Sequence, residues 1–143
     1  MKKIIFVCHG SICRSPVAEF VMKSLTNKLE IISRALSYEE IGNDIYPPMK
    51  RVLLDNKIPF TKHASNILTM EDYLRCDYLF YMDDNNKVRL KSILNNDMSK
   101  CFPITFYSDN INEIEDPYYT GNYRKVFEEI KVSCLDILSN IEK

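Results

Sequence analysis

The sequence predicts a single-domain α/β fold, a three-layer sandwich with a central four-stranded parallel sheet and helices on both faces. Two observations lead to this class. Apolar runs typical of buried strands alternate with segments whose apolar residues recur at helical spacing, and this alternation is characteristic of successive βαβ units. The chain has 143 residues and no internal repeat, low-complexity stretch or linker, so we expect one domain over residues 1–143.

The first two elements are the most clearly marked. The uninterrupted apolar run 4–7 predicts a strand buried on both faces. A loop over residues 9–14 follows it, and Ser15-Pro16 then predicts a helix start with proline at the first helical position. The buried face of that helix is predicted from apolar residues at helical spacing: Ala18, Val21, Met22, Leu25 and Leu29.

The later elements continue the alternation. Thr69 and Asp72 have the spacing of a capping box, which predicts a short helix at that point. The final helix is indicated by apolar residues that alternate by four and three from Tyr123 to Ile141. The remaining expected elements are strands at 31–33, 77–82 and 102–104, and helices that begin at Pro47-Pro48 and span about 85–94.

Composition limits the class of function. The formal charge of −1 gives no general attraction to nucleic acid or to an anionic membrane. No apolar stretch approaches the roughly 20 residues of a membrane span, and the run after Met1-Lys2-Lys3 is too short for a signal peptide. Five cysteines without a disulfide pattern predict free thiols in a reducing compartment, so we expect a cytoplasmic protein.

The loop after the first strand has the residues for oxyanion chemistry. Cys8 and Arg14 lie six positions apart around a turn in which Gly10 permits a close approach of the backbone. If the turn curls, its amides form an anion nest backed by a helix N-terminus, and Arg14 can hold two oxygens of a phosphate or sulfate. The same positive field stabilises a thiolate at Cys8, which is suited to attack on phosphorus. The spacing by itself also fits a cysteine that merely ends a buried strand.

The segment Val7–Glu19, with the motif Cys8-His9-Gly10-Ser11-Ile12-Cys13-Arg14-Ser15, resembles the N-terminal signature of the low-molecular-weight protein tyrosine phosphatases. Further motifs follow in the family's order over nearly the whole chain: 39–43, 46–48, 77–83 and Asp116-Pro117-Tyr118-Tyr119. The resemblance implies a phosphatase that hydrolyses phosphotyrosine in proteins and needs neither a metal nor another cofactor.

The resemblance also implies residue roles. Cys8 is the nucleophile that forms a phosphocysteine, Arg14 binds the phosphate, and Asp116 is the general acid and base. The phosphate-binding loop comprises His9, Gly10, Ser11, Ile12, Cys13 and Ser15.

Other implied roles lie around this loop. Ser15 either only caps the helix or also donates a hydrogen bond to the nucleophilic sulfur. His63 either supports the loop or is only a partly buried loop histidine. Cys13 is either a structural residue or the thiol that forms a reversible, redox-sensitive disulfide with Cys8. Tyr118 and Tyr119, with Tyr46 expected opposite them, line the substrate crevice.

One residue departs from the family pattern, because Ser11 stands where the family usually has asparagine. That asparagine helps to hold the loop through side-chain hydrogen bonds, so we expect Ser11 to contribute less to loop rigidity.

Three alternative functions stay open. A thioredoxin-coupled arsenate reductase of this fold needs two more cysteines in a segment that here, from Met82 to Ile93, contains none. A protein arginine phosphatase has threonine where this chain has Ile12. A binding module could capture oxyanions without turnover, although it would need neither Cys8 nor Asp116.

Overall fold

The protein is built on a four-stranded sheet in which every pair of neighbours is parallel. The computed structural model describes residues 1–142. The strand order is β2-β1-β3-β4, which confirms the predicted four-stranded parallel sheet. The strands are β1 (Lys2–Cys8), β2 (Leu29–Ala35), β3 (Tyr78–Tyr81) and β4 (Cys101–Pro103).

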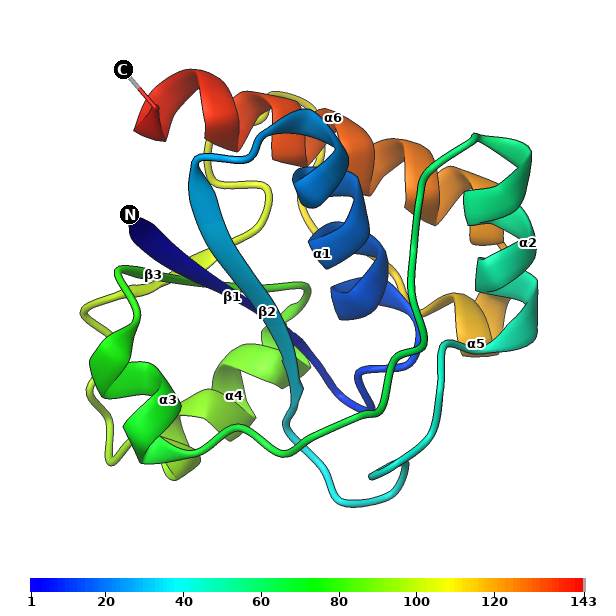
Figure 1. Cartoon of the computed structure of the whole chain (residues 1–143). Helices are drawn as coiled ribbons and strands as arrows, with labels where there is room; N and C mark the ends of the chain where they lie inside the picture. Colours follow the sequence, from blue (N-terminus) through cyan, green and yellow to red (C-terminus); the bar gives the residue numbers. More distant parts are fainter. Residues whose placement is uncertain (143) are drawn as a thin grey trace.

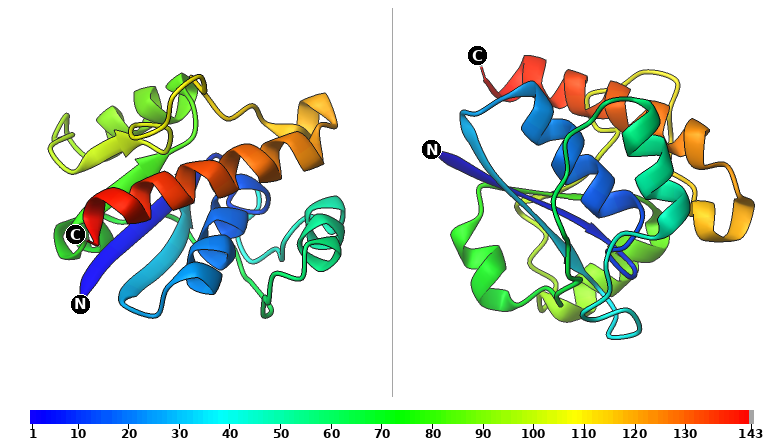
Figure 2. Two further views of the ribbon diagram at one scale, coloured as in Figure 1. Left: turned by 90° about the horizontal axis from the view of Figure 1, so that it is seen from above. Right: turned by 45° about the vertical axis from the view of Figure 1, so that its right-hand side comes forward.

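Helices cover both faces of the sheet and complete the three layers (Figure 1). One face carries α1 (Arg14–Leu25), α2 (Pro47–Asp55) and α6 (Tyr123–Ile141), and the other carries α3 (Met70–Arg75) and α4 (Asp84–Ile93). Figure 2 shows the long α6 lying across α1, with α2 beside its first turns. Among the described helices, none combines the length and the apolar character that crossing a bilayer requires.

The central strand β1 supplies both cores. Ile4, Phe6 and Cys8 belong to the core under α1, α2 and α6, whereas Ile5 and Val7 belong to the core under α3 and α4. Successive side chains of a strand point to opposite faces, so an apolar run without alternation is what a strand between two helical layers needs.

The helix boundaries differ from the sequence predictions in three places. α1 begins at Arg14, so Pro16 is its third residue and not its first. Leu29 does not extend the buried face of α1, because the helix ends at Leu25 and Leu29 begins β2. A short helix that was not predicted, α5 (Pro117–Thr120), follows Asp116. The capping box between Thr69 and Asp72 is present as predicted.

The strand order places one end of the sheet at a topological switch point. The chain leaves β1 toward β2 on one side, while β3 pairs with the other side of β1. Ligands of open α/β sheets bind beyond the carboxyl ends of the strands at such a point, because the loops there diverge and leave a crevice. In this chain, the segment after Cys8 and the segment after Tyr81 meet there.

Candidate active site

The loop between β1 and α1 curls tightly around the switch point. Ser11 has a left-handed backbone conformation, with φ +54°, which is uncommon for a residue that is not glycine. Gly10 lies under the side chain of Glu40, because a Cβ at position 10 would come within 3.0 Å of Glu40 Cγ. A Cβ at position 10 would therefore require the Glu40 side chain to shift slightly.

Cys8 lies buried at the base of the loop, only 3% exposed. Its Sγ lies 3.2 Å from the hydroxyl oxygen of Ser15 and 3.4 Å from the backbone nitrogen of Ser15, whose N–H donates to the sulfur. Both contacts place a group that can donate a hydrogen bond beside the sulfur. Ser15 thus contacts the sulfur and is not only a residue of the first helical turn.

The hydroxyls of Ser11 and Ser15 are 2.8 Å apart. A hydroxyl has one proton to donate. When Ser15 donates its proton to a Cys8 thiolate, the remaining contact requires Ser11 to donate to Ser15. Ser11 is fully buried, so this chain of hydroxyls is shielded from water. Ser11 therefore has a defined hydrogen-bond partner in the loop, the Ser15 hydroxyl. The absence of the family's usual asparagine at this position did not predict that contact.

Arg14 is held by two groups that lie far from it in the sequence, one just after β3 and one in the loop before α5. Its Nη1 donates to Asp83 Oδ2 at 2.7 Å and to the carbonyl oxygen of Ile114 at 2.8 Å, and its side chain is 2% exposed. Burial lowers the pKa of Arg14, but the charges of Cys8, Asp83 and Asp116 outweigh burial and raise that pKa above its ordinary value. The guanidinium therefore stays charged and fixed in place.

Asp116 lies at the mouth of the loop, beside Arg14. Its Oδ2 is 3.5 Å from Arg14 Nη2, and its Oδ1 accepts a hydrogen bond of 3.0 Å from the backbone N–H of Tyr118 at the start of α5. The side chain is 27% exposed. A carboxyl group held in this way faces the phosphate position and also reaches water, as a group that exchanges protons must.

Three groups outside the loop hold its carbonyl oxygens. His63 Nε2 lies 2.7 Å from the carbonyl oxygen of Ser11, and the Ser65 hydroxyl donates to that of Gly10 at 2.7 Å. The backbone N–H of Tyr46 donates to the carbonyl oxygen of Ile12 at 2.8 Å. With the carbonyls held outward, the amide N–H groups of a curled loop are free to face an anion.

Cys13 is the second thiol of the loop. It is 5% exposed. Burial, and next the negative charge of Cys8, raise the pKa of the Cys13 thiol well above its ordinary value. Cys13 therefore stays protonated while a neighbouring thiolate forms.

A hollow of about 170 Å³ opens over Cys8. Its lining residues are Cys8, His9, Gly10, Ser11, Ile12, Cys13, Arg14, Glu39, Glu40, Asp116, Tyr118 and Tyr119. Most of the loop and crevice residues proposed from the sequence thus meet in one place.

Tyr46 is placed differently from the sequence prediction. It does not line the hollow. Its ring packs near that of Tyr118, with centroids 5.5 Å apart, and its backbone N–H donates to the carbonyl oxygen of Ile12. Glu39 and Glu40 also line the hollow, and His9 lies 3.1 Å from Glu39.

Sequence reasoning did not assign roles to Asp83, Ser65, Glu39 or Glu40. Asp83 is the last residue of the motif at 77–83, and an acidic residue directly after the predicted strand 77–82 was the available signal. The glutamates lie within the similar segment 39–43 but were not assigned to the crevice. Ser65 had no distinguishing signal, because its contact with the loop spans 55 residues.

The chain is similar to known proteins over nearly its whole length. The sequence model of the family described as "Low molecular weight phosphotyrosine protein phosphatase" matches residues 3–143. The low molecular weight protein-tyrosine-phosphatase PtpA of Staphylococcus saprophyticus is 30% identical over 149 residues, with 100% of this chain and 96% of the relative covered.

Solved structures show the same similarity. The low molecular weight protein tyrosine phosphatase of Streptococcus pyogenes has a TM-score of 0.92 and 34% identity, covering 99% of this chain and 93% of that one. A protein tyrosine phosphatase of Entamoeba histolytica, solved with Hepes in its active site, has a TM-score of 0.90 and 27% identity, covering 99% and 97% of the two chains.

Proposed function

Because the chain belongs to the low molecular weight protein tyrosine phosphatase family and is a phosphatase of that family, we propose that it hydrolyses phosphotyrosine through a phosphocysteine at Cys8. In this proposal Arg14 binds the phosphate, and Asp116 is the general acid and then the general base. The supporting observation is the arrangement of one buried sulfur, one buried guanidinium and one partly exposed carboxyl around a single hollow.

The first step transfers the phosphoryl group to sulfur. The Cys8 thiolate attacks phosphorus, an S–P bond forms, and the P–O bond to the tyrosine ring breaks. Asp116 gives its proton to the departing phenolate oxygen. Arg14 and the loop amides hold the equatorial oxygens, where charge develops in the transition state.

The second step releases the phosphate. The Asp116 carboxylate takes a proton from water, and the water oxygen attacks phosphorus. The S–P bond breaks, inorganic phosphate leaves, and sulfur returns to the thiolate. The hydrogen bonds from Ser15 stabilise that thiolate as a leaving group.

An aromatic substrate fits the walls of the hollow. Tyr118 and Tyr119 are 55% and 82% exposed, their rings are 5.2 Å apart, and Ile12 adds an apolar side chain to the lining. A tyrosine ring can pack against these side chains while its phosphate reaches Cys8. The Entamoeba relative with Hepes, a sulfonate, in its active site supports the same preference for a tetrahedral oxyanion such as phosphate or sulfate.

The proposal includes phosphotyrosine proteins as partners and a reducing compartment such as the cytoplasm. The nucleophile must be a free thiol, and Cys8, Cys13, Cys76, Cys101 and Cys134 are all free.

The decisive experiment measures hydrolysis of para-nitrophenyl phosphate and of phosphotyrosine, phosphoserine and phosphoarginine peptides, with chelator present and Cys8→Ser as the control. We expect turnover of the aryl phosphate and the phosphotyrosine peptide only, and a radioactive phosphate trapped on the wild-type protein by rapid acid quench. Preferred cleavage of the phosphoarginine peptide would assign an arginine phosphatase, and full activity of Cys8→Ser would refute the proposed nucleophile.

A further inference from the structure

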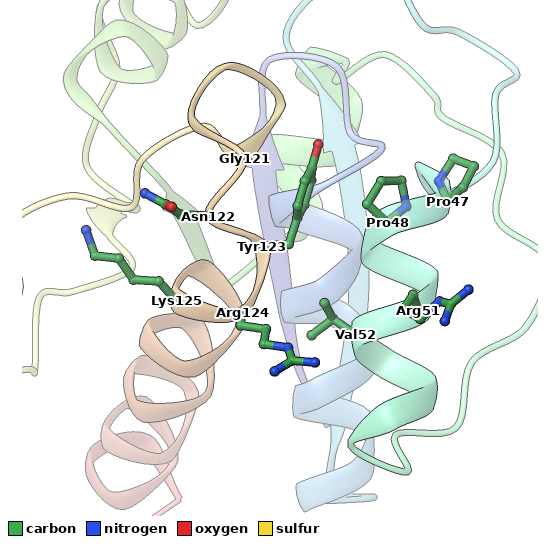
Figure 3. A pocket seen from close by; sticks show the side chains of 9 residues that line it. All are labelled: Pro47, Pro48, Arg51, Val52, Gly121, Asn122, Tyr123, Arg124 and Lys125. Carbon is green, nitrogen blue, oxygen red and sulfur yellow. The ribbon is translucent and has the colours of Figure 1, made fainter.

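A second, larger hollow lies between α2 and the first turn of α6 (Figure 3). It has a volume of about 690 Å³. Its lining residues are Pro47, Pro48, Arg51, Val52, Gly121, Asn122, Tyr123, Arg124 and Lys125. None of these residues is acidic, and three are cationic. We call this hollow the arginine groove.

Two of the three cations have no side-chain partner among the residues that the structure describes. Lys125 is paired with Glu115 and points away from the groove in Figure 3. Arg51 and Arg124 are exposed, and within residues 1–142 neither forms an ion pair or a hydrogen bond through its side chain. Figure 3 shows the Arg124 side chain extending from α6 toward Val52 on α2. In the same figure the Arg51 guanidinium lies on the side of α2 away from Arg124, so the two arginines occupy separate parts of the rim. Guanidinium groups bind carboxylates with planar geometry.

A row of tyrosine rings connects the groove with the catalytic hollow. Tyr118 lines the hollow over Cys8 and Tyr123 lines the groove. Tyr46 lies between them, with ring centroids 5.5 Å from Tyr118 and 6.3 Å from Tyr123. An extended peptide, at roughly 3.3–3.6 Å per residue, crosses this row in about four residues. The two hollows are thus close enough for one short segment to reach both.

The lining of the catalytic hollow carries the opposite charge to that of the groove. Glu39 and Glu40 line the hollow, so acidic residues of a substrate are repelled there and attracted toward Arg51 and Arg124. This asymmetry gives a peptide that carries acidic residues one preferred direction across the surface.

We propose that the arginine groove binds an acidic segment of the phosphotyrosine protein substrate, about three to six residues from the phosphotyrosine. The proposal rests on the proposed function in one respect: the phosphotyrosine itself occupies the hollow over Cys8. The apolar surfaces of Pro48, Val52 and Tyr123 receive the aliphatic parts of the segment, and the two arginines receive its carboxylates.

Peptide binding tests this proposal independently of turnover. Fluorescence anisotropy measures the affinity of the Cys8→Ser protein for two phosphotyrosine peptides. In one peptide the glutamates begin about three residues before the phosphotyrosine, and in the other about three residues after it. Each peptide is also made with glutamine in place of glutamate. Every peptide is measured in its phosphorylated and its unphosphorylated form. We expect the better acidic phosphopeptide to bind about five- to twentyfold more tightly than its glutamine counterpart at low salt, and the ratio to approach one at about 1 M salt.

The variant pair Arg51→Gln with Arg124→Gln identifies the groove. Each exposed charge is expected to contribute about two- to fivefold, so the double variant should reduce the acidic-to-glutamine ratio to near one. The matched control is Lys87→Gln with Lys91→Gln, which removes two exposed charges from α4 on the other face of the sheet and should retain the wild-type ratio.

The results distinguish a failure of the groove proposal from a failure of the proposed phosphatase function. An unchanged ratio in the arginine double variant, or an equal loss in the lysine control, would overturn the groove as the binding site. If phosphorylation does not strengthen binding of the glutamine peptide, the phosphotyrosine assignment of the catalytic hollow fails. The unphosphorylated acidic peptides still report on the groove in that case, because their dependence on Arg51 and Arg124 is read separately.

Discussion

Replacing Asp83 tests whether Arg14 is positioned from the end of a second strand. Asp83 Oδ2 accepts from Arg14 Nη1 at 2.7 Å, while its Oδ1 accepts from the backbone N–H of Asn86 at 2.8 Å and caps α4. Asparagine is as good a helix cap as aspartate. Asp83→Asn therefore removes the ion pair and keeps the cap, whereas Asp83→Ala removes both.

The size of the effect follows from burial. The side chains of Arg14 and Asp83 are 2% and 18% exposed, so solvent screens the pair little. Removing one partner of a buried pair costs about 3–5 kcal/mol. Arg14 keeps its 2.8 Å bond to the Ile114 carbonyl and its 3.5 Å contact with Asp116. We therefore expect Asp83→Asn to lower the free energy of unfolding by about 2–3 kcal/mol, and Asp83→Ala by about 1 kcal/mol more.

The same substitution should slow catalysis. Without Asp83, the guanidinium of Arg14 is free to turn toward Asp116 and away from the phosphate position of the proposed mechanism. A hydrogen bond to a charged group contributes about 1.5–3 kcal/mol, so kcat for para-nitrophenyl phosphate is expected to fall by about ten- to a hundredfold.

Urea unfolding and initial rates measure the two effects. The control is Asp84→Asn, which removes an exposed carboxylate one residue away and should change stability by no more than about 0.5 kcal/mol. If Asp83→Asn matches this control in stability and retains wild-type kcat, Arg14 is held by the backbone alone and the reasoning is wrong. Equal losses for the asparagine and alanine variants would show that the cap contributes nothing.

Three further outcomes are expected. Asp116→Ala should slow aryl phosphates with poor leaving groups by about 10²–10⁴-fold and those with good leaving groups far less; steady-state rates across a series of substituted phenyl phosphates measure this, and equal losses would contradict the acid role. Ser11→Asn should maintain or raise turnover, because asparagine tolerates the left-handed conformation at φ +54° better than serine does, whereas Ser11→Ala should slow it about threefold or more by removing the partner of Ser15; a slower asparagine variant would argue against this account. Burial raises the pKa of the Cys76 thiol to about 11 from 9.0, so the folded state holds this proton more tightly than the unfolded state; stability is complete below about pH 9 and is lost by on the order of 2 kcal/mol as pH rises to 11. Urea unfolding between pH 8 and 11 should show this fall, and Cys76→Ala should make it shallower; an identical slope would refute the assignment.

Local patterns were sufficient for most of the fold. The apolar run 4–7 predicted β1 because a strand between two helical layers is apolar on both sides. Thr69 and Asp72 predicted the start of α3 because a capping box is a contact between residues three apart. The boundary of α1 was less accurate: Leu29 has the right spacing to follow Leu25, but the chain has already turned into β2.

The sequence by itself predicted the strands and helices and their order along the chain, because these depend on contacts between residues close together in the chain. It also indicated Cys8 as the proposed nucleophile and the loop after it as the proposed phosphate site. It also determined the family, through several motifs in one order. Only the tertiary structure decided how Arg14 is held, since Asp83 and Ile114 lie 69 and 100 residues away from it. It likewise placed the ring of Tyr46 against that of Tyr118 and brought Glu39 and Glu40 into the lining of the hollow. These contacts follow from the order of parallel strands, which brings the ends of β1 and β3 and the loops beyond them to one edge of the sheet.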